Sequence, residues 1–302
     1  MLFEFFSIFI NVVTPVFALV IIGYWAGPRL NLEARTLSRT AYYVFIPAFV
    51  FDTLVKIHLE TSSAARMVAY ILIVHLACAA LGFLTAKLLR RPREVVAAFT
   101  LIAVFGNIGN FGLSIIEFGL GKEALAAGTI YFVAINTLAF AIGVAAASWA
   151  KGSGFGAIGS VVKTPGLIAM AAALAVQGMR LQLPLSVLRI TGLLGQAMIP
   201  LMLVTLGVQL AAVKKFHITG DVIIVSAIRL LGGPVLAALL VIPFGLTGIE
   251  RGAGILQAAM PAAVLTSIIA IEYDVVPDFV TTSVLFSTLA SLLTLTVVLW
   301  MM

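Results

Sequence analysis

Residues 105–112 read Phe-Gly-Asn-Ile-Gly-Asn-Phe-Gly and lie in the middle of an apolar segment, about residues 96 to 121. That segment is long enough to cross a bilayer, for which a helix needs about 20 residues. Its three glycines and two asparagines disfavour a continuous helix, because Gly is a weak helix former and Asn competes for backbone hydrogen bonds. Non-helical backbone is tolerated at that depth only where it is buried in protein or lines a cavity. The stretch therefore predicts two half-helices that meet at a binding site.

The composition identifies an all-α polytopic membrane protein. Of the 302 residues, 62% are hydrophobic and only 10% are charged, a balance that excludes a soluble domain of this size. The net charge of +6 does not indicate nucleic-acid binding, because Lys and Arg gather in short loops where they set membrane orientation. The single cysteine, Cys78, excludes an internal disulfide and a cysteine-based metal cluster.

Hydropathy predicts ten membrane spans and no additional soluble domain. The spans cover about residues 5–26, 36–56, 66–89, 96–121, 124–149, 162–180, 185–210, 221–245, 252–272 and 278–302. The loops after spans 1, 3, 5 and 7 carry eleven Lys and Arg residues, against six on the opposite side. Since cytoplasmic loops are enriched in Lys and Arg, both termini are predicted on the non-cytoplasmic side of the cell (inner) membrane.

Short sequence matches recur between the two halves at a nearly constant offset. Thr14-Pro15 recurs as Thr164-Pro165, Ile46-Pro47 as Ile199-Pro200, Ser114-Ile115-Ile116 as Ser267-Ile268-Ile269, and Thr137-Leu138-Ala139 as Thr288-Leu289-Ala290. These matches predict one five-span repeat over 1–150, a linker over 151–160 and a second repeat over 161–302. Because five is odd, the second copy enters the membrane from the opposite face, which gives a 5+5 inverted repeat.

The same symmetry predicts a second interruption in span 9, where Pro261 lies at the position equivalent to the first break. A proline inside a helix removes one hydrogen bond and clashes with the preceding turn, so span 9 is expected to break or kink there. An ordinary kink is the alternative. Paired with the break in span 4, Pro261 predicts two broken helices that cross near the membrane midplane.

Such a crossing suits an anion. The second half-helices, which would start near Phe111 and Ala262, present unsatisfied N–H groups and about half a positive charge each. The predicted substrate-binding residues are Gly106, Asn107, Gly109, Asn110, Tyr131, Asn136, Met260, Pro261 and Ala262. The alternatives are that the asparagine amides only satisfy local backbone, and that Tyr131 belongs to an interfacial aromatic belt.

Four further polar residues within the spans are candidates for charge or proton coupling, namely His75, Arg229, Asp52 and Gln257. An arginine at membrane depth is expensive, so Arg229 should face protein, a cavity or a carboxylate. It could balance a substrate carboxylate, reach the cytoplasmic surface, or form a structural pair with Asp52. His75 could exchange protons near neutral pH or be a hydrogen-bonded spectator. Recognisable catalytic, nucleotide-binding and metal-binding motifs are not found, so no enzyme, cofactor or metal is predicted.

The text ILQAAMPAAVLTSIIAIEYDVVPDFVTTSVLF, residues 255–286, resembles the auxin efflux carrier family, whose plant members have a Gln-Ala-Ala-x-Pro segment leading into Glu-Tyr and Pro-Asp. In span 4, Asn107 and Gly112 match an asparagine and a glycine of the plant motif, whereas Gly106 and Ser114 stand where that motif has prolines. The resemblance covers essentially the whole chain, apart from the long plant cytoplasmic loop.

The resemblance implies a bacterial-type member that carries small organic-acid anions such as malonate or malate. It also implies a transport domain of spans 3–5 and 8–10 that moves against a scaffold of spans 1, 2, 6 and 7, with a homodimer formed through the scaffold. The leading hypothesis is thus a secondary active or facilitative transporter of mono- or dicarboxylates that works by alternating access. The alternatives are a cation/proton antiporter or sodium-coupled symporter of similar fold, and a non-transporting membrane sensor.

The orientation is testable by cysteine labelling in a background in which Cys78 is replaced. Cysteines placed near Arg91 and Lys214 should be protected from impermeant thiol reagents added outside, because these loops are predicted to be cytoplasmic. A cysteine near Glu60 or Arg251 should react. The reverse labelling pattern would overturn the predicted orientation.

Overall fold

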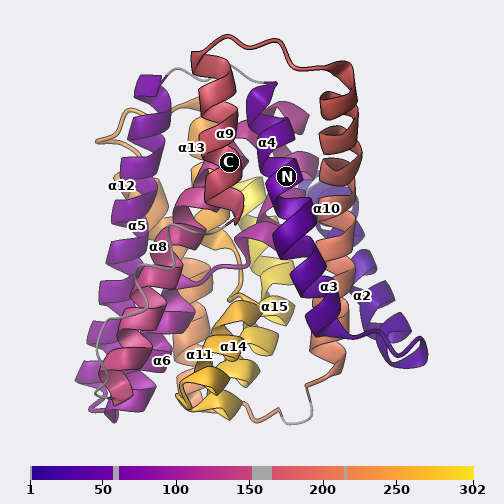
Figure 1. Ribbon diagram of the computed structural model, residues 1–302. Coiled ribbons are helices and arrows are strands. Elements are labelled where there is room, and N and C mark those ends of the chain that lie inside the picture. The colour runs from indigo at the N-terminus through magenta and orange to yellow at the C-terminus, as the bar shows by residue number, and fades with distance from the viewer. Residues whose placement is uncertain (1, 57–60, 152–164, 214–215) are drawn as a thin grey trace.

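The computed structural model describes residues 2–56, 61–151, 165–213 and 216–302, and within these ranges the chain is almost entirely helical (Figure 1). In the described part, the β-type backbone pairing consists of one isolated antiparallel bridge between Gly106 and Ala262. The predicted linker over 151–160 lies outside the described residues except for Lys151.

Helices occupy each of the ten intervals predicted as spans, and several intervals contain more than one helical element. The first half contains α1 (Leu2–Ile8), η1 (Phe9–Val13), α2 (Thr14–Arg29), α3 (Ala34–Thr40), η2 (Ala41–Phe45), α4 (Ile46–Val55), α5 (Thr61–Leu88), α6 (Arg93–Val104), η3 (Ile108–Gly112), α7 (Leu113–Leu120), η4 (Lys122–Ala124) and α8 (Leu125–Lys151). The second half contains α9 (Pro165–Gly178), α10 (Leu185–Ala211), α11 (Gly220–Ala227), η6 (Ile228–Gly232), α12 (Gly233–Leu240), α13 (Gly248–Ala259), α14 (Val264–Glu272) and α15 (Pro277–Trp300).

Within the described part, five helical stretches are long and apolar enough to cross a membrane, judged by length and composition. They are Phe3–Arg29, Ser62–Leu88, Leu185–Ala211, Gly220–Leu240 and Pro277–Trp300, and Ile108–Leu120 and Pro165–Gly178 are shorter apolar helices. The chain is thus an all-helical protein with several membrane-spanning candidates. The inverted repeat of ten spans stays a prediction.

Three prolines follow directly on π-helical turns. The elements η1, η2 and η6 are each five residues of π-helix, and the helix after each has a proline at its second residue, namely Pro15, Pro47 and Pro234. A proline lacks an N–H and its ring clashes with the preceding turn. The wider π turn relieves that crowding, which lets these spans continue past a proline with little interruption.

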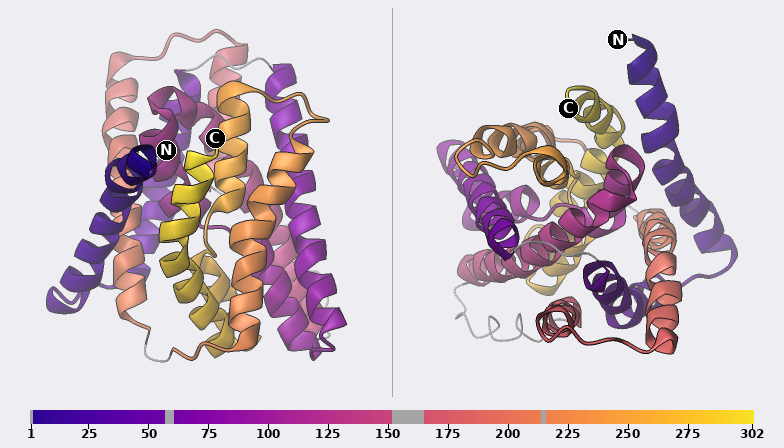
Figure 2. Two further views of the ribbon diagram at one scale, coloured as in Figure 1. Left: turned by 180° about the vertical axis from the view of Figure 1, so that it is seen from behind. Right: turned by 90° about the horizontal axis from the view of Figure 1, so that it is seen from above.

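The helices pack in two groups. In one group, α10 packs along α2 and α4, and α4 packs along α9. In the other, α5 packs against α6, α8 and α12, and α13 packs against α8 and α12. The view from above shows the N-terminal helix at the edge of the bundle, on the side opposite α5 (Figure 2). The contact between α2 and α10 is the most extensive between any two elements, so it organises the first group.

Two glycines allow α2 and α10 to approach to backbone contact. A Cβ atom on Gly23 would lie 2.0 Å from the carbonyl oxygen of Val204, and one on Gly207 would lie 2.0 Å from that of Val20. Helices in membranes associate through such small residues because hydrophobic burial does not distinguish protein from lipid. Any side chain at either position would force the two backbones apart.

We predict that Gly23→Ala and Gly207→Ala each lower the thermal stability of the purified protein, at a cost of about 1–3 kcal/mol for overpacking. The matched control is Gly178→Ala, since a Cβ there meets no described atom within 4 Å. Melting temperatures in detergent measure the effect. Equal melting temperatures for all three variants would contradict the close backbone contact.

Candidate functional site

Two helix breaks meet in the interior and hydrogen-bond to each other. The first follows the end of α6 at Val104, and the second follows the end of α13 at Ala259. Between them the backbone N–H of Asn107 donates to the carbonyl of Pro261 (2.7 Å), and that of Ala263 donates to the carbonyl of Phe105 (2.9 Å). In Figure 1 the corresponding extended stretches lie near the middle of the bundle. Each break therefore satisfies backbone groups of the other.

The side chain of Arg229, in η6, binds the C-terminal ends of α6 and α13, the two helices that precede the breaks. Its Nη1 donates to the carbonyls of Ala103 (2.8 Å) and Val104 (3.5 Å) at the end of α6. Its Nε and Nη2 donate to carbonyls at the end of α13, those of Met260 (2.7 Å), Ala258 (3.1 Å) and Gln257 (3.4 Å). Arg229 is only 1% exposed, so all of these bonds lie in the protein interior.

A cavity of about 230 Å³ lies on the other side of the breaks, and we call it the central cavity. One wall, which we call the break wall, is formed by residues of and beside the two breaks and by residues of α8. The facing wall is formed by residues of α3, η2, α4, α9 and α10. The central cavity thus lies between the two packing groups of helices. The breaks contribute Phe105, Gly106, Asn107 and Ala263, and the first residues of η3 and α14 contribute Ile108, Gly109, Asn110, Val264 and Leu265. Helix α8 contributes Phe132, Val133, Asn136 and Thr137.

Hydrogen-bond donors of the break wall face the central cavity. The elements η3 and α14 begin at Ile108 and Val264, and their first residues line it. The first N–H groups of a helix have no partner within the helix and carry partial positive charge. Asn107 is 5% exposed, and its Nδ2 atom finds no hydrogen-bond partner among the described residues. An acceptor or anion in the central cavity could accept hydrogen bonds from these groups.

The structure brings five of the nine predicted substrate-binding residues to the central cavity, namely Gly106, Asn107, Gly109, Asn110 and Asn136. Met260 and Ala262 are fully buried and Pro261 is buried, and these three do not line it. These three residues form the second break but do not reach the central cavity. Tyr131 is also off the cavity wall, and its hydroxyl donates to the carbonyl of Glu250 (2.9 Å).

His75 and Gln257 are fully buried away from the central cavity. The Nδ1 atom of His75 donates to the carbonyl of Ile71 (3.0 Å), and its Nε2 finds no hydrogen-bond partner in the described part of the chain. The Nε2 atom of Gln257 donates to the carbonyl of Gly128 (3.2 Å), which ties α13 to α8. Gln257 therefore holds two elements of the break wall together.

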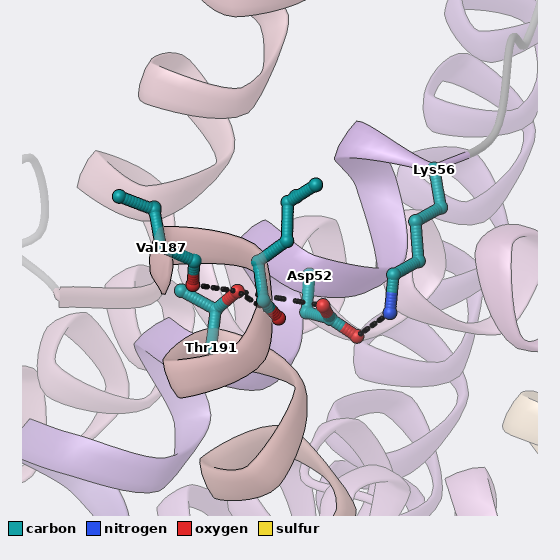
Figure 3. Close-up of polar contacts among 5 residues, drawn as sticks. Asp52, Lys56, Val187 and Thr191 are labelled. Atoms are coloured by element: carbon teal, nitrogen blue, oxygen red, sulfur yellow. Dashed lines mark hydrogen bonds and ion pairs between the residues drawn. The ribbon is translucent and has the colours of Figure 1, made fainter. Parts of the chain in front are cut away.

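The structural pair between Arg229 and Asp52 that the sequence left open does not form. Asp52 binds Lys56 (2.7 Å) one turn further along α4, and the hydroxyl of Thr191 in α10 lies 3.4 Å from its other oxygen (Figure 3). The Thr191 hydroxyl also lies within bonding distance of the Val187 carbonyl (3.0 Å). Asp52 thus connects α4 with α10, whereas Arg229 binds backbone carbonyls.

The facing wall contains polar residues that sequence reasoning did not assign to the site. Ser38, Tyr42, Thr205 and Gln209 line the central cavity, and Nε2 of Gln209 donates to the hydroxyl of Ser38 (2.9 Å). Thr205 and Gln209 are isolated polar residues in an apolar stretch, and Ser38 lies among other polar residues, so neither pattern distinguishes a cavity position from one that faces solvent or lipid. The resemblance placed spans 2 and 7 in a scaffold, and only tertiary packing shows that these residues face the breaks.

A family model described as membrane transport protein matches residues 8–146 and 157–299, nearly the whole chain. The chain belongs to this family, the auxin efflux carriers. The resemblance read from the two break motifs is confirmed. Family membership makes the chain a membrane transport protein and not an enzyme.

Relatives of this auxin efflux carrier family member occur in archaea, bacteria and plants. An "Uncharacterized transporter" of Methanothermobacter thermautotrophicus is 28% identical over 94% of this chain and 95% of its own length. A "Putative malonate transporter" of Rhizobium meliloti is 24% identical over 96% of this chain and 95% of its own. A "Probable auxin efflux carrier component 1c" of Oryza sativa subsp. japonica is 30% identical over 37% of this chain and 19% of its own.

Proposed function

We propose that this protein is a secondary active or facilitative transporter that moves small organic-acid anions across the membrane by alternating access. The observation that carries the proposal is the break wall of the central cavity. It combines two helix N-termini with the unpartnered amide of Asn107. These groups donate hydrogen bonds and present partial positive charge, which is the chemistry that binds a carboxylate.

The character of the lining favours an anion over a cation. Among the described residues that line the central cavity, none is Asp or Glu. Proton-coupled cation sites in membranes commonly use a buried carboxylate, so a cation/proton antiporter has less support here. The name of the Rhizobium meliloti relative, "Putative malonate transporter", agrees with a carboxylate substrate.

The size of the central cavity favours a small acid. At about 230 Å³ it lies below the ~300–1,000 Å³ of pockets that hold drug-sized ligands. Hydroxyl and amide groups on the facing wall, such as those of Ser38 and Gln209, can bind the polar remainder of such an acid. We therefore assign a short mono- or dicarboxylate as the substrate class.

The position of the central cavity between the two packing groups of helices supports the proposal of alternating access. We propose that the group of α2, α4, α9 and α10 is a scaffold and that the helices around the breaks move against it. The facing-wall residues Ser38 and Gln209 lie close to the loops predicted as cytoplasmic. The structure is therefore proposed to represent the state that receives substrate from the cytoplasm.

The test is a flux assay in proteoliposomes that contain the purified protein. Radiolabelled mono- and dicarboxylates, malonate among them, are offered with imposed proton, sodium and voltage gradients. Saturable uptake of at least one small acid is expected, and the gradient that accelerates it identifies the coupling ion. A ligand-dependent shift in melting temperature without any flux would instead indicate a non-transporting sensor.

We predict that Asn107→Ala weakens binding of the transported acid by about 1.5–3 kcal/mol, the range for a hydrogen bond to a charged group, or roughly tenfold to a hundredfold. Its melting temperature should stay near wild type, because the Nδ2 atom makes no bond within the described protein. Asn110→Ala should have a milder effect, and Asn11→Ala, at an exposed position far from the breaks, should have none. Equal loss of folded protein in both Asn107→Ala and Asn110→Ala would show that the amides only support the backbone.

A further inference from the structure

The contacts of Arg229 differ from those expected of a substrate-binding arginine. Its five hydrogen bonds all end on backbone carbonyls, two at the end of α6 and three at the end of α13. Its side chain does not line the central cavity. An arginine has five N–H donors in a fixed planar arrangement, so these carbonyls occupy the whole donor set.

The helix ends that Arg229 binds are the two that carry negative charge. The last carbonyls of a helix lack partners within the helix and together carry about half a negative elementary charge. The ends of α6 and α13 therefore bring roughly one negative charge to the same interior point. One guanidinium offsets it, which a neutral side chain could not do in a medium without water.

The starts of η3 and α14 give the central cavity a partial positive charge. The two helix starts at Ile108 and Val264 carry about half a positive charge each. The negative charge at the nearby ends of α6 and α13 is already neutralised by Arg229. A single carboxylate in the central cavity would complete the balance. Without the guanidinium, the negative helix ends would cancel much of that attraction.

The absence of a side chain on Gly106 leaves the space that the Arg229 guanidinium occupies. A Cβ atom on Gly106 would lie 2.4 Å from Nη2 and 3.0 Å from Cζ of Arg229. Only a residue without a side chain can pair with Ala262 there while Arg229 keeps its bonds.

We propose that Arg229 is the positioning residue of the anion site, a role that rests on the proposed function. It holds the ends of α6 and α13 together, keeps the bridge between Gly106 and Ala262 in register, and leaves the opposite helix starts free to bind a carboxylate. It acts through the two breaks and does not touch the substrate.

The test combines a substrate-independent measurement with a binding measurement on the full-length protein. Hydrogen exchange by mass spectrometry follows peptides that contain the bridging amides of Asn107 and Ala263, and binding of radiolabelled malonate gives the affinity. The variants are Arg229→Gln and Arg229→Lys. The control is Lys56→Gln, which removes the same charge from a residue that pairs with Asp52.

In Arg229→Gln, exchange at both breaks should become at least tenfold faster and malonate affinity at least tenfold weaker. Arg229→Lys should be intermediate, because an ammonium keeps the charge and loses the planar donor set. Lys56→Gln should leave both readouts unchanged. If Arg229→Gln does not fold, Gly106→Ala displaces the guanidinium without removing it and should accelerate exchange at the same two peptides.

Unchanged exchange at both breaks in Arg229→Gln, or in Gly106→Ala where that substitute is needed, overturns the proposal. Loss of affinity with unchanged exchange also overturns it, since Arg229 would then act on the anion directly. If exchange accelerates as expected but the wild-type protein binds neither malonate nor any acid of the flux screen, the anion-transport proposal fails. The role of Arg229 in holding the breaks would then stand.

Discussion

The hydrogen bonds between the two helix breaks are the constraint on which the rest of the structure depends. An unpaired backbone N–H or C=O in a water-free interior costs several kcal/mol, so a membrane protein cannot interrupt one helix without a partner for the freed groups. Here the N–H of Asn107 and that of Ala263 each find a carbonyl of the opposite break. The hydroxyl of Ser287 accepts from the N–H of Ala262, and Arg229 binds the carbonyls that remain at the helix ends.

The arrangement of the two breaks places the C-terminal and the N-terminal helix ends on different sides. The negative ends of α6 and α13 face Arg229 in the closed interior, whereas the positive starts of η3 and α14 face the central cavity. The described lining of the central cavity thus combines these helix starts with the Asn107 amide and contains no lysine or arginine. In the proposed transporter, such helix starts would hold an anion less firmly than a direct ion pair does, which suits a carrier that must also release its substrate.

Much of this arrangement was predictable from the sequence, because helix breaks have local causes. The glycines and asparagines of 105–112 and the proline at 261 disfavour helix wherever they occur, and both predicted interruptions are present. The side chains that meet at the breaks were less predictable. For Arg229 the sequence left a substrate carboxylate, the cytoplasmic surface and a pair with Asp52 open. The carbonyls at two helix ends that it binds become apparent only once the helices are placed. For the same reason the facing wall, with Ser38 and Gln209, was not predicted. Tyr131 was expected at the site, whereas its hydroxyl donates to the carbonyl of Glu250 and does not line the central cavity.

The most direct test of the central claim is a cryo-EM structure of the protein at a saturating concentration of malonate. The account predicts density for the acid in the central cavity. One carboxylate should lie within hydrogen-bonding distance of the Asn107 amide and of the backbone N–H groups at the start of α14. Arg229 should keep its bonds to the ends of α6 and α13. Malonate bound elsewhere, or a carboxylate in direct contact with Arg229, would contradict the account.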